Sequence, residues 1–129
     1  MTSKEINSLE KLYSKFTEEC ERVGKIISKV YWNYHYWCAS DCYNWSIESD
    51  TVSGRGIDDD GGKMYCEFPA KYLTMSDSEL TDMVNKMSAD YWEEKHRKDE
   101  EEKHRNEEAT IKRELAELKR LKEKYEKGE

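Results

Sequence analysis

The pattern of apolar positions near the amino terminus predicts a long helix that packs against another helix. Apolar residues recur there at alternating spacings of three and four, as they do at positions a and d of a heptad repeat. The a positions are Ile6, Tyr13, Cys20, Ile27 and Tyr34, and the d positions are Leu9, Phe16, Val23, Val30 and Trp37. A helix with such a stripe is not stable alone in water, so it needs a partner helix from this chain or from a second copy.

Local signals set the expected ends of this first helix. Thr2 and Glu5 have the spacing of a capping box, which predicts the start of a helix. The segment from Val30 to Trp37 is rich in residues that favour strands, yet its apolar positions keep the heptad register. We therefore expect helix over residues 3–38.

The middle of the chain alternates between apolar and polar residues, a pattern typical of half-buried strands. One such segment contains Trp45, and a second contains Cys66 and Phe68. Turn-forming Gly and Asp residues separate the two, and Pro69 ends the second because it has no N–H to donate to a ladder. The pattern predicts a small antiparallel β-hairpin or meander over residues 43–70.

A second capping box, Ser76 with Glu79, predicts another helix over residues 76–126. Residues 93–108 contain no apolar side chain, so this part is expected to be a solvated helix supported by ion pairs between its own turns. An apolar stripe returns near the carboxyl end at Ile111, Leu115, Leu118, Leu121 and Tyr125. The fold class that follows is α+β, mainly α, in one structural unit.

The polar middle of the second helix affects which helices can pair with each other. If that helix folded back along the first, charged residues would lie against the first helix's apolar stripe and leave it uncovered. We therefore expect a homo-oligomer formed by a coiled coil of first helices, although a bend in the second helix offers an intramolecular alternative. The expected interface consists of Ile6, Leu9, Tyr13, Phe16, Val23, Ile27 and Val30.

Composition narrows the possible functions. Of 129 residues, 40% are charged and 36% hydrophobic, which leaves room for one domain at most and excludes a large core. A net charge of −7 disfavours binding to nucleic acid, because such binding relies on an excess of Lys and Arg. No apolar run approaches the roughly 20 residues that span a bilayer. We expect a cytoplasmic protein with reduced cysteines and no membrane association.

Aromatic residues gather between positions 31 and 45, where seven occur within 15 positions. One helix cannot bury all of them on one face, so they either divide between core and surface or form a recognition surface for a protein or a stacked nucleotide base. Lys63 and Lys71 are further candidates, besides Arg55, for binding a nucleotide phosphate. The candidate binding residues are Tyr31, Trp32, Tyr34, Tyr36, Trp37 and Arg55.

The sequence carries no catalytic constellation. It has no nucleophile placed beside a base and no phosphate-binding glycine loop, so we expect neither catalysis nor a cofactor. Zinc is an alternative at His35, Cys38, Cys42 and Cys66, since the first three share a face of a continuing helix. Unpaired buried thiols are the simpler interpretation of the same cysteines.

A short stretch of the chain resembles a known class of proteins. It reads Thr51-Val52-Ser53-Gly54-Arg55-Gly56, then Cys66-Glu67-Phe68-Pro69-Ala70-Lys71-Tyr72-Leu73, then Ser76-Asp77-x-Glu79. This is similar to small accessory proteins of bacteriophages, in which a hairpin ending in Phe-Pro-x-x-Tyr-Leu runs into an acidic, Lys/Glu-rich helix. The resemblance implies a phage or prophage origin, and therefore the host cell cytoplasm.

Three functional hypotheses follow. The first is a non-catalytic phage accessory protein that oligomerises by coiled coil and binds a host protein, inhibiting a defence or regulatory factor. The second is a protein that sequesters a small nucleotide signal, with Tyr31, Trp32, Tyr36 and Arg55 around it. The third is a structural coiled-coil protein of a virion or scaffold.

Overall fold

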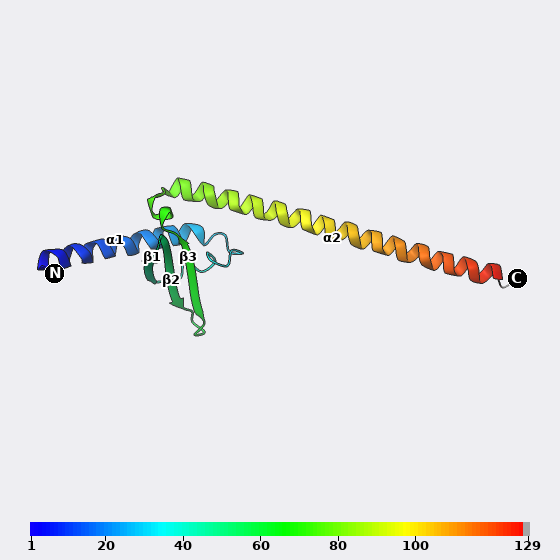
Figure 1. Cartoon of the computed structure of the whole chain (residues 1–129), viewed down its shortest axis with the longest axis horizontal. Coiled ribbons are helices and arrows are strands. Elements are labelled where there is room, and N and C mark those ends of the chain that lie inside the picture. The colour runs from blue at the N-terminus through cyan, green and yellow to red at the C-terminus, as the bar shows by residue number, and fades with distance from the viewer. Residues whose placement is uncertain (128–129) are drawn as a thin grey trace. The chain divides into compact units, whose positions relative to one another are not determined.

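The computed structural model describes residues 1–127, which divide into two compact units. The first unit is Met1–Ser88 and the second is Ala89–Glu129. The chain is mainly helical with one small antiparallel sheet (Figure 1), which confirms the expected fold class. The division into two units differs from the expected single unit, because residues 93–108 offer no apolar side chain for a core.

Helix α1 spans Ser3–Ile27. Its first turn carries the predicted capping box: the Glu5 amide donates to Thr2 Oγ1 and the Thr2 amide donates to Glu5 Oε1, each at 3.1 Å. The prediction that the helix continues to residue 38 is wrong. Ser28 caps the helix, with its amide donating to the Gly24 carbonyl oxygen.

The residues after α1 form a series of turns instead of further helix. The Asn33 side chain accepts a hydrogen bond from the His35 amide at 2.9 Å, a local bond that competes with helical pairing. The His35 carbonyl oxygen then accepts from the Glu67 amide at 3.2 Å, which ties this segment to the third strand. Apolar spacing alone does not reveal such competition, so it could not distinguish this segment from a helix.

Three strands form the sheet in the order β1-β2-β3, with β1 at Asn44–Glu48, β2 at Thr51–Ile57 and β3 at Lys63–Pro69. Both pairings are antiparallel, so the expected meander is confirmed. Across the sheet, Trp45 pairs with Gly54, and Gly54 pairs with Cys66. The indole lies directly over Gly54, where an added Cβ would come within 2.5 Å of the ring.

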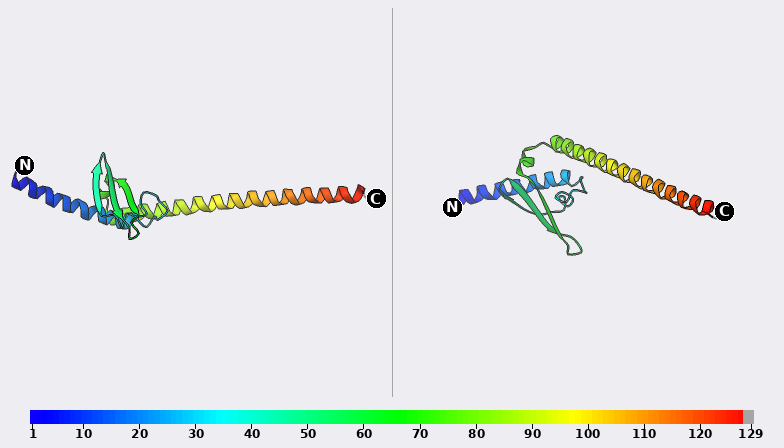
Figure 2. Two further views of the ribbon diagram at one scale, coloured as in Figure 1. Left: turned by 90° about the horizontal axis from the view of Figure 1, so that it is seen from below. Right: turned by 45° about the vertical axis from the view of Figure 1, so that its right-hand side comes forward.

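The core of the first unit lies between the sheet and the second half of α1. Figures 1 and 2 show the sheet against that half, while the first half of α1 extends past the sheet. From α1 the core takes Cys20, Val23 and Ile27, all fully buried, and Phe68 enters from β3. Burial of such apolar side chains is the main stabilising contribution to this unit.

Two further elements follow the sheet. The short 3-10 helix η1, Ala70–Thr74, buries Tyr72, whose ring stacks on Phe68 with centroids 5.9 Å apart. Helix α2 spans Asp77–Lys127 and begins with the predicted capping box, in which the Glu79 amide donates to Ser76 Oγ at 3.1 Å. Within the first unit its first turns contribute Leu80 and Val84 to the core. The second unit consists of the rest of α2.

Candidate functional site

The first half of α1 exposes an apolar surface, which we call the α1 apolar face. Ile6, Leu9, Leu12 and Tyr13 are 45–65% exposed, and Phe16 is half-buried where the helix reaches the core. Four such side chains in solvent on one helix half are unusual for a surface that binds nothing. This face is therefore a candidate for binding another molecule.

Carboxylates border the α1 apolar face. In the heptad register Glu5 precedes Ile6 at position g and Glu10 follows Leu9 at position e, so the two carboxylates flank the apolar residues. Hydrogen bonds from the Thr2 backbone amide, and then from its hydroxyl, lower the pKa of Glu5 and favour its ionised form. A partner that complements the face has an apolar surface bordered by Lys or Arg.

The second half of the predicted interface is used inside the chain. Val23, Ile27 and Val30 are each fully buried in the first unit. This differs from the expectation that they face a second copy, because they pack into the core of the first unit instead. Of the expected interface residues, only Ile6, Leu9, Tyr13 and Phe16 remain accessible.

The aromatic segment divides between surface and core. Tyr31, Tyr34 and Trp37 are exposed, whereas Trp32 is half-buried against the core. Tyr36 is buried, with its hydroxyl 3.0 Å from that of Tyr72, and burial is the main cause that raises its pKa. The exposed rings remain candidates for binding, but Tyr36 is part of the core and not open to a ligand.

Of the four proposed zinc ligands, the three cysteines lie near one another in the core, whereas His35 lies beside Glu67. Cys38, Cys42 and Cys66 are buried, with the first two sulfurs 3.9 Å apart, while His35 is half-exposed and its Nδ1 lies 3.3 Å from Glu67 Oε1. Burial raises the pKa of Cys66 to about 11, which favours the neutral thiol over the thiolate that binds metals. Within residues 1–127, no group of three or more His, Cys, Asp or Glu side chains is arranged to hold a metal ion.

A groove of about 390 Å³ at the end of the sheet joins basic and aromatic side chains. It is lined in part by Tyr43, Arg55, Lys63 and Tyr65. The Arg55 guanidinium carbon lies 5.4 Å from the centre of the Tyr65 ring, a distance at which the cation and the ring attract. An anionic ligand in this groove would meet two cationic side chains.

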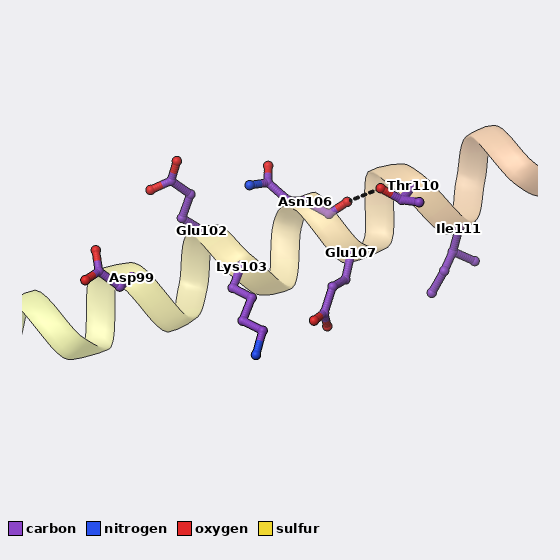
Figure 3. Close-up of a pocket in the computed structure, with 7 residues that line it drawn as sticks. All are labelled: Asp99, Glu102, Lys103, Asn106, Glu107, Thr110 and Ile111. Atoms are coloured by element: carbon purple, nitrogen blue, oxygen red, sulfur yellow. Dashed lines mark hydrogen bonds between the residues drawn. The ribbon is translucent and has the colours of Figure 1, made fainter.

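A second hollow, of about 660 Å³, lies along α2 in the second unit. Figure 3 shows that its lining comes from one helix, with the hydroxyl of Thr110 donating to the carbonyl oxygen of Asn106 at 2.9 Å. Glu107 and Ile111 project to the same side of the helix. A single helix encloses no ligand, so this hollow is not a ligand-binding pocket.

Sequence reasoning missed several residues of these surfaces. Leu12 lies outside the a and d positions, yet it is among the exposed apolar residues of α1. Tyr65 joins Arg55 because the two are directly paired across β2 and β3. The alternation in both strands was the signal that could have placed their side chains on one face.

Comparison with protein-family models, with curated proteins and with solved structures finds no match. Among the described residues, no helix has the length and apolar character needed to cross a membrane. The proposal of a function therefore depends on the surfaces described above.

Proposed function

We propose that this protein is a non-catalytic binding module of phage type that captures a host protein through the α1 apolar face. The observation that carries the proposal is the exposure of Ile6, Leu9 and Tyr13 on a helix half that extends past its own sheet. The resemblance of residues 51–79 to small phage accessory proteins supports a host protein as the partner. Binding would inhibit a defence or regulatory factor by occupying its surface.

The charges at the face support a different protein over a second copy of α1. In a parallel pair of α1 helices, Glu5 at position g faces Glu10 at position e of the other copy, and like charges oppose pairing. A host segment with an apolar stripe and flanking Lys or Arg residues avoids this repulsion.

The experiment compares Leu9→Lys with a matched control on the opposite face of the same helix half. Asn7→Lys introduces the same charge at an exposed polar position. The full-length chain and both variants are used to capture proteins from a lysate of the host bacterium, and the captured proteins are quantified by mass spectrometry. We expect a specific protein that the parent and Asn7→Lys retain and that Leu9→Lys loses at least tenfold.

A photo-reactive residue in place of Leu12 gives an independent test, with Ser14 as the control position. The same host protein should be crosslinked from position 12 and not from position 14. Equal capture by parent and Leu9→Lys, or equal crosslinking from both positions, would contradict the proposal.

The groove at the end of the sheet favours a second candidate function, the binding of a small anionic ligand such as a nucleotide. Arg55 and Lys63 would hold the phosphate while Tyr43 and Tyr65 contact the base. This differs from the expected set around Tyr36, which is buried. Calorimetric titration with a panel of nucleotides tests it: binding should be lost in Arg55→Gln and Lys63→Gln and kept in Lys71→Gln, and no binding to the parent would exclude it.

A further inference from the structure

The last part of α2 exposes apolar side chains that no described residue of the second unit covers. Ile111, Leu115, Leu118 and Tyr125 are 56–72% exposed. They recur at alternating spacings of four and three, apart from one position taken by Lys122. In heptad terms Leu115 and Lys122 occupy position a, and the other three occupy position d. An apolar stripe of this kind is typical of a helix that pairs with another helix.

The residues that flank this stripe carry ordered charges. Position g is Glu107, Glu114 and then Leu121, and position e is Lys112, Lys119 and then Glu126, so two of the three g–e pairs join opposite charges. In a parallel, in-register pair, each g residue faces the e residue five positions further along the other helix. Glu107 therefore faces Lys112 of the second copy, and Glu114 faces Lys119 of the second copy. By symmetry each attraction occurs twice.

The same charge pattern continues upstream in the same register. Glu93 is followed five positions later by Lys98, and Glu100 by Arg105. Within one helix only residues three or four apart are neighbours, so a spacing of five does not serve ion pairing inside α2 itself. Lys98, however, lies 3.9 Å from Glu94 in its own helix, so the proposed pairing depends on the downstream charges that flank the apolar stripe.

We propose that two copies of this chain associate in parallel and in register through residues 107–126 of α2. An antiparallel arrangement is disfavoured, because it places g against g and e against e, which opposes Glu to Glu and Lys to Lys. Lys122 at an a position favours a two-stranded pair, since a larger bundle encloses its ammonium group more completely.

The pairing does not extend along the whole of α2. The upstream a and d positions include Glu94, Arg97 and Glu101, and Arg97 instead forms ion pairs with both glutamates in its own helix. Charged side chains at these positions do not form an apolar layer. The paired segment is short, so the dimer is weak and its population depends on protein concentration.

Charge exchange tests the proposed pairing. One variant of the full chain carries Glu107→Lys and Glu114→Lys, and a second carries Lys112→Glu and Lys119→Glu. Sedimentation equilibrium should give a concentration-dependent dimer for the parent. Each variant alone should have a dimer dissociation constant at least tenfold higher than that of the parent. An equimolar mixture of the two variants should form a dimer again. Circular dichroism verifies that both variants stay helical, as expected for substitutions at exposed positions.

A cysteine crosslink tests orientation and register. Leu118→Cys places a thiol at position d, where it meets its own copy in a parallel pair, whereas the control Ala116→Cys lies at position b on the outer side. All four native cysteines are buried and do not compete. Mild oxidation should link Leu118→Cys chains and leave Ala116→Cys chains unlinked. A monomeric parent, or equal crosslinking of the two variants, would overturn the proposal.

The proposal is independent of the function assigned to α1. Leu9→Lys is expected to leave the α2 dimer unchanged, and the charge-exchange variants are expected to retain the host protein in the capture experiment. If Leu9→Lys weakens self-association at least tenfold, the two copies pair through α1 and the α2 interface is wrong.

Discussion

The two halves of α1 continue one apolar stripe but have different surroundings. In the second half, Cys20, Val23 and Ile27 are fully buried in the core, whereas in the first half Ile6, Leu9 and Tyr13 are about half exposed. The spacing of apolar residues is the same in both. Periodicity therefore identifies which face of a helix is apolar, but what covers that face depends on residues far away in the sequence.

The largest expected effect comes from placing the same charge in each half. Val23→Lys buries an ammonium group among apolar side chains and should lower the free energy of unfolding by about 3 kcal/mol or more. Leu9→Lys places it in solvent and should change that free energy by less than about 0.5 kcal/mol. Urea denaturation followed by tryptophan fluorescence measures both. Similar losses in the two variants would show that the first half of α1 is also covered.

An intermediate effect is expected for substitutions to alanine in the two halves of α1, which should change the free energy of unfolding in opposite directions. In an exposed helix, Gly→Ala is stabilising by about 1 kcal/mol. At Gly24, however, an added Cβ would lie 2.6 Å from the Ala39 carbonyl oxygen, so we expect Gly24→Ala to lower the free energy of unfolding by about 1–3 kcal/mol.

Ser14→Ala in the exposed half is the matched control for Gly24→Ala. Its side chain is in solvent, so higher helix propensity should stabilise the protein by a few tenths of a kcal/mol, or about 0.5 at most. Thermal denaturation of the two variants gives the comparison. A stabilising Gly24→Ala would mean that α1 and the segment around Ala39 are not in close contact.

A more gradual effect is expected from alkaline pH, where stability is lost one pH unit at a time. Burial, and then the neighbouring Cys66, raise the pKa of Cys20 from 9.0 to about 12. The unfolded thiol ionises first as the pH rises, so the stabilising contribution is complete below pH 9.0 and is lost progressively toward pH 12. Each pH unit in this range should cost up to about 1.4 kcal/mol per such thiol.

Cys20→Ala separates this contribution from other alkaline effects. The free energy of unfolding of the variant should fall less steeply than that of the parent between pH 8 and about pH 10. Equal slopes would show that Cys20 is accessible to hydroxide in the folded protein.

The sequence predicted the features that depend on neighbouring residues. Both capping boxes form as expected, because each bond joins residues three positions apart. The alternation around Trp45 and Phe68 likewise predicted the strands, since each residue's side of the sheet follows from its position along the strand.

Features that depend on distant residues could not be predicted in this way. The hydroxyl of Tyr36 meets that of Tyr72, which is 36 positions away, so nothing near Tyr36 indicated that it was core. For the same reason the sequence could not separate the covered half of α1 from the open half. For the candidate site, the apolar spacing predicted the residues of the α1 apolar face apart from Leu12.

The bond between the Glu67 amide and the His35 carbonyl oxygen has a consequence for aggregation. β3 is an edge strand, and unpaired amides and carbonyls along such an edge invite strands from other molecules. The segment after α1 occupies part of that edge, where the Cys38 thiol also donates to the Tyr65 carbonyl oxygen at 3.2 Å. The opposite edge, β1, has only five residues. The covered edge at β3 and the short edge at β1 both oppose the addition of strands from other molecules. The sheet is therefore expected to stay at three strands and not to grow into a fibre.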